Sequence, residues 1–436
     1  MLRAIVVALC MLLSGGAFAA KLQALKAGDF AGAWLIRDKE ATSLKLNLYI
    51  LTGERDGVGV EGLAHYVEHL AWENMKKDNA EPRAGHSNAF TSSDLMGYWL
   101  SGEPEQAAEL LSDLLKVHQP LTVEETFALE EREIIQREYD YRERENWRAL
   151  AWRGLMRRLH ADDPRQRDVG GSPEVISRYS LSEARQLHRQ THNPQNSVLV
   201  LQGNLSKNAA NKLLRDALGR SQINKKALPR SESTDYRMAA ATRDLSTKHY
   251  TGVTQPELLY TKLVRLPEAL PISDLFAQTE LLDRLLSSRL EGGLSVPLHY
   301  DNFFANDFSL DISVVDKQHV LMYVEATPDV GVSLQTLLQA VESELSKTAE
   351  AGLQNTVVEK IRQRAVEQFL SYDQVRTQSH ILQSYLEMRE TPVDNKKYLS
   401  YLKRSDTDSV VRLLQALAGE GRVVAELVEL PEEVSQ

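Results

Sequence analysis

The stretch Gly62-Leu63-Ala64-His65-Tyr66-Val67-Glu68-His69-Leu70 decides how the rest of the chain is interpreted. It is predicted to be a helix, in which His65 and His69 lie one turn apart on the same face. Glu68 lies beside the pair. Two imidazoles and a carboxylate at this spacing can hold a zinc ion and activate the water on it. The order H-x-x-E-H inverts the commoner H-E-x-x-H. The alternative is a helix that merely carries two histidines on its surface.

Length and composition indicate a globular protein of two domains. The 436 residues exceed one ordinary core, and the apolar share of 42% and charged share of 26% are typical of globular chains. The formal net charge of −10 argues against nucleic acid as a partner. An acidic protein that cuts polypeptides would tend to attract basic ones.

Residues 1–19 have the pattern of a secretory signal peptide. Arg3 precedes an apolar run from Ala4 to Leu13, and Ala17-Phe18-Ala19 form a small-x-small cleavage site. We therefore expect cleavage before Ala20, a mature net charge of −11 after the loss of Arg3, and a periplasmic location. The apolar run is too short for a membrane span, and no later stretch is long enough to be one. The alternative is a buried N-terminal helix.

The cysteine content restricts the metal ligands. Cys10, the single cysteine of the chain, lies inside the predicted signal, so the mature chain has no thiol and no disulfide. A catalytic zinc site uses three protein ligands and keeps one open position. The helix supplies two of the three, so the third must be a distant histidine or carboxylate.

A charged helix, expected from about Val123 to beyond Trp147, carries Glu131 and Glu138 two turns apart on one face. One of these carboxylates can bind the metal while the other hydrogen-bonds a ligand from behind. The alternative for such a charged run is a solvated helix face.

The remaining chain suggests a duplicated unit. Strands are expected at Ala33–Arg37 and Leu44–Leu51. The expected divisions are a zinc-bearing N-terminal domain over residues 20–220, a linker over 221–246, and a second domain over 247–436. The segment from Glu131 to Asp140 aligns with that from Arg364 to Asp373, where Ser371 stands opposite Glu138. The expected helix from Ser273 has no H-x-x-E-H, so only the first unit would have kept a metal site.

Several motifs together resemble the pitrilysin/insulinase family of zinc peptidases, in particular its short bacterial members and the mitochondrial processing peptidases. The matching segments are His65-x-x-Glu68-His69, Asn88-Ala89-Phe90-Thr91, Glu131 to Glu138, Asn193-Pro194-Gln195-Asn196-Ser197, and Ser287-Ser288-Arg289-Leu290. The resemblance implies an α+β fold of two homologous α/β-sandwich domains. Each would have an antiparallel-rich sheet with helices on one side, and together they would form a clamshell.

The resemblance also implies the roles of individual residues. One zinc ion would be held by His65, His69 and Glu138, with Glu68 as general base and Glu131 supporting a ligand. Asn88 would contact the backbone of a substrate that adds as a strand to an exposed sheet edge. Two departures stand out. The interval between His69 and Glu138 is shorter than usual, and the family's second-domain arginine is missing although Tyr300 can be its tyrosine.

The predicted function is therefore that of a zinc metalloendopeptidase acting on peptides or unstructured polypeptides in the periplasm. A catalytically weak or inactive family member, serving as a partner subunit or peptide-binding protein, is the first alternative. A zinc-independent periplasmic binding protein and a peptidase that processes one dedicated precursor are the others. The sequence leaves a homodimer and an assembly with a sister subunit both open.

Overall fold

The structure, a computed structural model, describes residues 21–56, 59–75, 86–144, 146–218, 236 and 241–431, without the side chains of 143 and 144. The predicted signal peptide and most of the predicted linker lie outside these residues. The described strands are β1 (Lys21–Ala24), β2 (Gly32–Arg37), β3 (Leu44–Ile50), β4 (Ser87–Thr91), β5 (Met96–Gly102), β6 (Ser197–Gly203), β7 (Arg243–His249), β8 (Glu257–Arg265), β9 (Ala305–Val314), β10 (His319–Pro328) and β11 (Arg422–Glu429).

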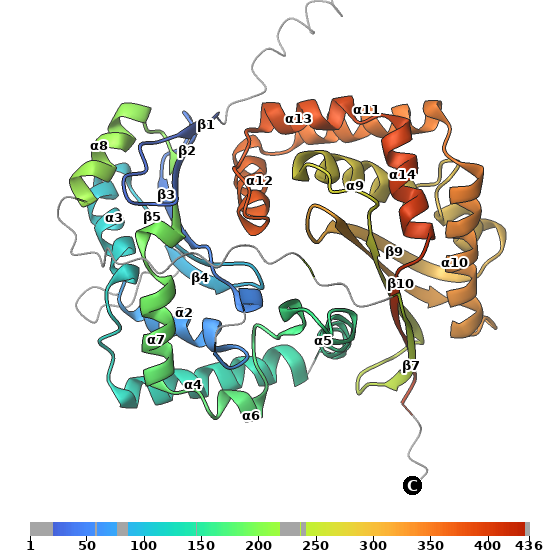
Figure 1. Cartoon of the computed structure of the whole chain (residues 1–436), viewed down its shortest axis with the longest axis horizontal. Coiled ribbons are helices and arrows are strands. Elements are labelled where there is room, and N and C mark those ends of the chain that lie inside the picture. Colours follow the sequence, from blue (N-terminus) through green and yellow to red (C-terminus); the bar gives the residue numbers. More distant parts are fainter. Residues whose placement is uncertain are drawn as a thin grey trace, which may run out of the picture.

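The described α-helices carry the labels of Figure 1. They are α2 (Leu63–Glu73), α3 (Ala107–Leu115), α4 (Glu125–Tyr139), α5 (Trp147–Leu159), α6 (Pro173–Ile176), α7 (Leu181–Thr191), α8 (Lys207–Leu218), α9 (Ile272–Leu286), α10 (Leu334–Ala351), α11 (Asn355–Ser371), α12 (Gln374–Glu387), α13 (Asn395–Arg404) and α14 (Thr407–Ala418). None of them is long and apolar enough to cross a membrane.

The two sheets repeat one topology. The first has the order β1-β2-β6-β3-β5-β4 and the second β7-β11-β8-β10-β9. Setting β1 aside, the strands correspond one to one, because β2 pairs with β6 in parallel as β7 does with β11. All other neighbours in both sheets are antiparallel. The expected α+β fold with two antiparallel-rich sheets is therefore confirmed.

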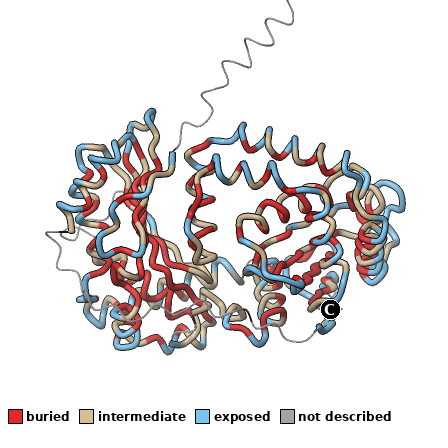
Figure 2. Tube along the Cα trace, turned by 45° about the horizontal axis from the view of Figure 1, so that its top comes forward, coloured by how far each residue is buried: buried red, intermediate tan, exposed pale blue. Residues whose placement is uncertain are grey.

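Strand alternation directs apolar side chains to both faces of the first sheet. Leu44, Leu46, Leu48 and Ile50 of β3 point into a core that α2, α3, α7 and α8 cover, in line with the period of a half-buried strand. Tyr49, from the same strand, faces the other way and packs against Leu382 and Leu386 of α12. In Figure 2 the buried residues accordingly run along the strands and the inward-facing sides of the helices.

The halves exchange one helix each. Helix α12, from the second half, packs on the free face of the first sheet. Helix α5, from the first half, places Trp147, Ala151 and Leu155 against Leu259 and other buried residues of the second sheet. Figure 1 shows both helices between the two halves. Each sheet therefore has a layer of its own helices on one face and a helix from the other half on the opposite face.

Two expectations about element boundaries differ from the structure. The long charged helix does not run past Trp147, since α4 ends at Tyr139 and one π-helical turn, Asp140–Arg144, leads to the separate helix α5. Strand β7 begins at Arg243, inside the interval 221–246 expected to be linker. The division of the chain into domains at the stated residues stays a prediction.

Four histidines outside the motif are buried in the first half: His118, His160, His188 and His192. His118 Nε2 lies 2.9 Å from Ser197 Oγ, and His188 Nε2 lies 2.8 Å from the Val117 carbonyl oxygen. Burial lowers the pKa of His118 to about 3 and that of His188 to about 4, and it holds the pKa of His192 well below its usual value. These side chains are neutral structural groups at neutral pH.

Candidate metal centre

The first turn of α2 is fixed by a glycine. Gly62 has a φ of 78°, and a Cβ at this position would clash with the Tyr179 hydroxyl and lie 2.8 Å from the Gly171 nitrogen. Helix α2 then buries Leu63, Val67 and Leu70 in the core. The 3.6-residue period consequently turns the three motif side chains together toward α4.

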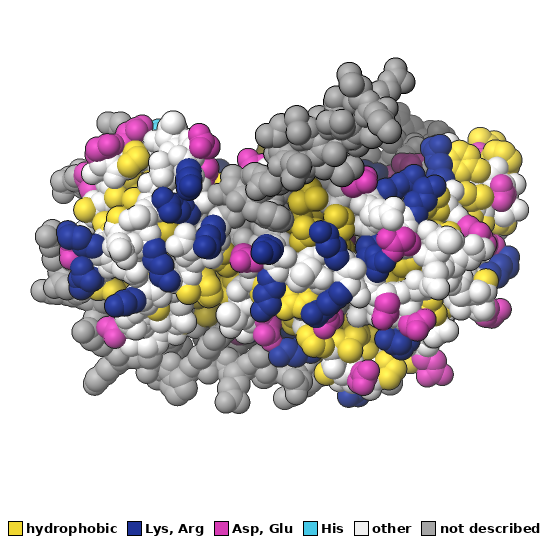
Figure 3. All heavy atoms as spheres, turned by 90° about the horizontal axis from the view of Figure 1, so that it is seen from above, with side chains coloured by type: hydrophobic (Ala, Val, Ile, Leu, Met, Phe, Trp, Pro, Cys, Tyr) yellow, Lys and Arg dark blue, Asp and Glu magenta, His cyan; other side chains and the backbone are white. Residues whose placement is uncertain are grey.

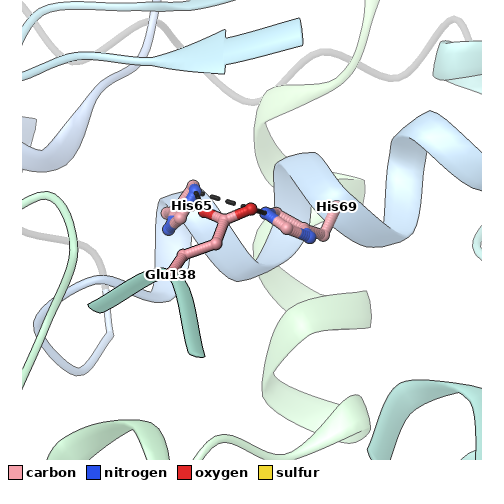
Figure 4. A group of neighbouring side chains, drawn as sticks. All are labelled: His65, His69 and Glu138. Carbon is pink, nitrogen blue, oxygen red and sulfur yellow. Dashed lines mark hydrogen bonds and ion pairs between the residues drawn. The ribbon is translucent and has the colours of Figure 1, made fainter. Parts of the chain in front are cut away.

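The motif histidines and Glu138 of α4 converge (Figure 4). His65 Nε2 lies 3.3 Å from His69 Nε2, and Glu138 places one oxygen 3.7 Å from His65 Nε2 and the other 3.9 Å from His69 Nε2. These three residues form the one group in the described residues whose donor atoms lie within 4.8 Å of one another as a metal site requires. Ala128 and Ile135 anchor α4 in the core from the neighbouring part of the same helix face, because Ile135 and Glu138 are three residues apart.

Glu131 lies behind the histidines, one of the two positions that the sequence left open. Its Oε2 is 2.9 Å from His69 Nδ1. Because a carboxylate only accepts hydrogen bonds, Nδ1 carries the proton and Nε2 keeps a free lone pair toward His65 and Glu138. The hydrogen bond therefore sets the tautomer that a metal ligand needs.

Glu68 is held from the edge strand β4. The Thr91 hydroxyl donates to Glu68 Oε2 at 2.9 Å, and this oxygen is 4.0 Å from His65 Nε2. From the sequence, Thr91 was identified only as part of the family-like segment Asn88–Thr91, and its contact with Glu68 was not predicted. The signal for its role was the strand period, which places Ala89 and Thr91 on the face of β4 toward α2.

Burial dominates the electrostatics of the site. It lowers the pKa of His65 to about 3 and raises the pKa of Glu68 to about 7. Burial also lowers the pKa of His69, but the hydrogen bond that His69 donates to Glu131 and the charges of Glu68 and Glu138 outweigh it, so that this pKa is raised overall. Carboxylates and neutral imidazoles are thus brought together out of water, an arrangement that a divalent cation would stabilise.

The donor set fits zinc. Ligand atoms about 2.1 Å from a tetrahedral zinc ion lie about 3.4 Å apart, near the spacings among His65, His69 and Glu138. Glu138 Oε2 is buried and accepts no hydrogen bond, although the Arg142 guanidinium lies 3.4 Å away. A buried carboxylate oxygen without a hydrogen bond is unusual and is satisfied by a cation. Such a donor set is typical of metal-dependent hydrolases.

The remaining predicted residues occupy two places. A cavity of about 610 Å³ opens over the donors and includes Asn88, Phe90 and Arg142 in its lining. Tyr300, which is 39% exposed, lies on the π-helical turn Val296–Asp301 and is not among the described residues that line this cavity. Arg142 was missed in the sequence, although its position four residues after Glu138 on a continuing helix was a usable signal.

Comparisons with known proteins agree with this class. Residues 33–170 match the family model described as insulinase, peptidase family M16. A protein of Mycobacterium leprae called an uncharacterized zinc protease is 26% identical over 204 residues, which are 44% of this chain and 45% of that protein. The chain thus matches less than half the length of this relative.

Solved structures share the fold over almost the whole chain. A protease from Helicobacter pylori gives a TM-score of 0.76 at 16% identity, covering 94% of this chain and 100% of that one. The periplasmic protease PqqL from Escherichia coli gives 0.74 at 16% identity, covering 94% of this chain and 47% of that one. A peptidase M16 inactive domain from Pseudomonas fluorescens gives 0.75 at 13% identity, covering 95% and 99%. The match of residues 33–170 and the zinc-protease relatives support the resemblance to the pitrilysin/insulinase family.

Proposed function

We propose that the chain is a zinc-dependent endopeptidase that hydrolyses peptides or unstructured polypeptides in the periplasm. The observation that carries the proposal is the convergence of His65, His69 and Glu138, contributed by two helices about seventy residues apart in sequence. The family supports peptidase activity, and the name of the M. leprae relative supports zinc. The signal-like residues 1–19 and the similarity to a periplasmic protease support the location.

His65, His69 and Glu138 would hold the zinc ion, and Glu131 would keep His69 in the binding tautomer. When bound, zinc supplies a Lewis acid and makes water more acidic. Glu68 takes a proton from the attacking water on its carboxylate and later gives it to the leaving amine. Thr91 fixes one oxygen of that carboxylate through its hydroxyl.

The edge strand β4 is the proposed site of substrate attachment. It pairs only with β5 among the described strands, so its other edge can accept an extended peptide. Asn88 lies on this strand and in the lining of the cavity over the donors. A peptide added here would run alongside Glu68 and the metal ligands.

The second candidate function is that of a catalytically weak or inactive subunit. Two observations favour it: the chain shares its fold with a domain described as inactive, and no arginine lies between Arg289 and Tyr300. Partnership with a second copy or a sister subunit belongs to the same proposal. Cleavage by the purified chain alone would contradict this candidate.

The test combines metal analysis with cleavage of a mixed library of unstructured peptides, with cut sites mapped by mass spectrometry. We expect near-stoichiometric zinc in the wild type and its loss in a His65→Ala, His69→Ala double variant. Glu68→Gln should keep zinc and lose at least about 100-fold in turnover, as expected for removal of a general base. Glu130→Gln, an exposed position on α4, is the matched control. Equal cleavage by wild type and Glu68→Gln would exclude the proposed mechanism.

A further inference from the structure

A second cavity of about 700 Å³ adjoins the one over the metal ligands, because Phe90 lines both. One wall is the face of β3 and β5 that points away from the core of the first half. The other wall is α12, the helix that the second half contributes. The cavity is therefore completed only when both halves are in place, and the proposed mechanism does not use it.

Lys45 stands out on the β3 wall. Strand alternation places it opposite to Leu44 and Leu46, so its side chain runs into the cavity and not into the core. The ammonium lies 4.3 Å from the centre of the Trp99 ring. Burial lowers the pKa of Lys45, and among the described residues it has no carboxylate within ion-pair distance.

Both acidic and basic groups line the cavity around Lys45, but the acidic groups already accept backbone hydrogen bonds or are exposed to water. Asp373 caps the start of α12 by accepting the backbone N–H groups of Val375 and Arg376, each at 2.9 Å. Asp38 accepts the backbone N–H of Glu40 at 3.0 Å. Glu40 and Asp373 are exposed, so water screens their charge. The partly buried Lys45 contacts Trp99 but forms no ion pair with a described carboxylate.

Arg376 lies on the opposite wall, on α12, where its Nε donates to His380 Nε2 at 3.4 Å. The two walls thus direct cationic and N–H groups into one space whose apolar surfaces are Trp99 and Phe90. In Figure 3 basic, acidic and apolar side chains are interspersed over the face seen from above.

We propose that this second cavity binds a carboxylate of the substrate polypeptide, from an acidic side chain or a free C-terminus, with Lys45 over Trp99 as its main contact. The proposal rests on the peptidase function proposed above and adds a substrate class to it. A carboxylate gives the partly dehydrated ammonium the partner it lacks, and the indole holds the ammonium in place from its other side. Arg376 supplies a second cation from the other half of the chain.

The test measures binding separately from cleavage. Fluorescently labelled unstructured peptides are titrated with the zinc-loaded Glu68→Gln variant by anisotropy, which needs no turnover. One series moves a single Gln→Glu change along the peptide, a second replaces the same residue with Lys, and a third compares a C-terminal carboxylate with its amide. We expect about 10-fold tighter binding for Glu at one position or for the free C-terminus, as for a hydrogen bond to a charged group.

Matched variants assign the effect to Lys45. Lys45→Met in the Glu68→Gln background should reduce the 10-fold preference to less than 2-fold, whereas Lys45→Arg should retain it. Lys212→Met, on the exposed face of α8, should leave the preference unchanged. Circular dichroism confirms that each variant is folded.

A ratio below 2-fold for every carboxylate, or tighter binding of the Lys peptides, would overturn the proposal. Cleavage by wild type is scored separately. A wild type that binds with the expected preference but does not cleave would overturn only the proposed peptidase function.

Discussion

Replacement of Glu131 tests whether the tautomer of His69 is set from behind the metal ligands. The Oε2–Nδ1 distance is 2.9 Å, and both side chains are only 14% exposed, so water screens this contact weakly. A hydrogen bond to a charged group contributes about 1.5–3 kcal/mol, which corresponds to about 10- to 150-fold in an equilibrium constant. Loss of such a partner behind a metal-bound histidine typically weakens metal binding 10- to 100-fold.

We therefore expect Glu131→Leu to raise the zinc dissociation constant about 10- to 100-fold at pH 7.5. Glu131→Gln should have a smaller effect, because its amide oxygen can still accept the Nδ1 proton without the added strength of a charge. The assay is a competition titration against a chromogenic chelator, with far-ultraviolet circular dichroism of the metal-free proteins. Glu130→Leu, at an exposed neighbouring position, is the control. A Glu131→Leu protein whose zinc affinity stays within 2-fold of wild type would refute the reasoning.

Three further predictions concern stability and the shape of the cavities. Acidification from pH 7.5 to 5 should lower the free energy of unfolding measured with urea. Burial depresses the folded-state pKa values of His118 and His188, so both side chains gain protons on unfolding. Their contribution to stability is intact above about pH 6.5 and is lost as the pH falls towards the folded values of about 3 and about 4. Each can add a slope of up to about 1.4 kcal/mol per pH unit, and a pH-independent free energy would contradict this. Gly97→Ala should displace Phe90, whose ring occupies the space a Cβ would need, and so change KM at least about 3-fold, roughly 0.7 kcal/mol, while zinc content stays the same. Leu382→Ala should destabilise the protein by about 2–5 kcal/mol, because Leu382 is 1% exposed between α12 and the first sheet, whereas Leu129→Ala, at a position that is 40% exposed, should have little effect on the melting temperature.

The motif helix and the core face of β3 could be predicted from the sequence because both follow a local period. Leu44 to Ile50 alternate strictly, and His65 and His69 are one turn apart. Glu138 could be placed in a pair with Glu131 because the predicted mature chain has no cysteine and a third ligand was required. Their separate roles depend on how α4 crosses α2, which no local pattern contains.

Features that depend on packing between segments far apart in the sequence could not be predicted from local patterns. The break after Tyr139 has no proline or glycine to mark it, and the charged sequence around Asp140 continues the helical pattern. It occurs because α5 leaves its own half to pack on the second sheet. The cavity of Lys45 and Trp99 was equally hidden, since its second wall, α12, begins more than 270 residues further along the chain than either residue.

Because each half packs one helix, α5 or α12, on the sheet of the other, the two halves are interlocked like the subunits of a dimer that exchange a helix. In each half, one apolar face of the sheet is covered by a helix from the other half. Neither half alone can bury that face, so neither should be obtainable as a folded fragment on its own. A chain cut between residues 218 and 241 should instead remain one particle of two fragments, each holding the other's helix. Substitutions in α12, in a half that contributes none of the three proposed ligands, would then affect the sheet against which the histidine-bearing helix α2 packs.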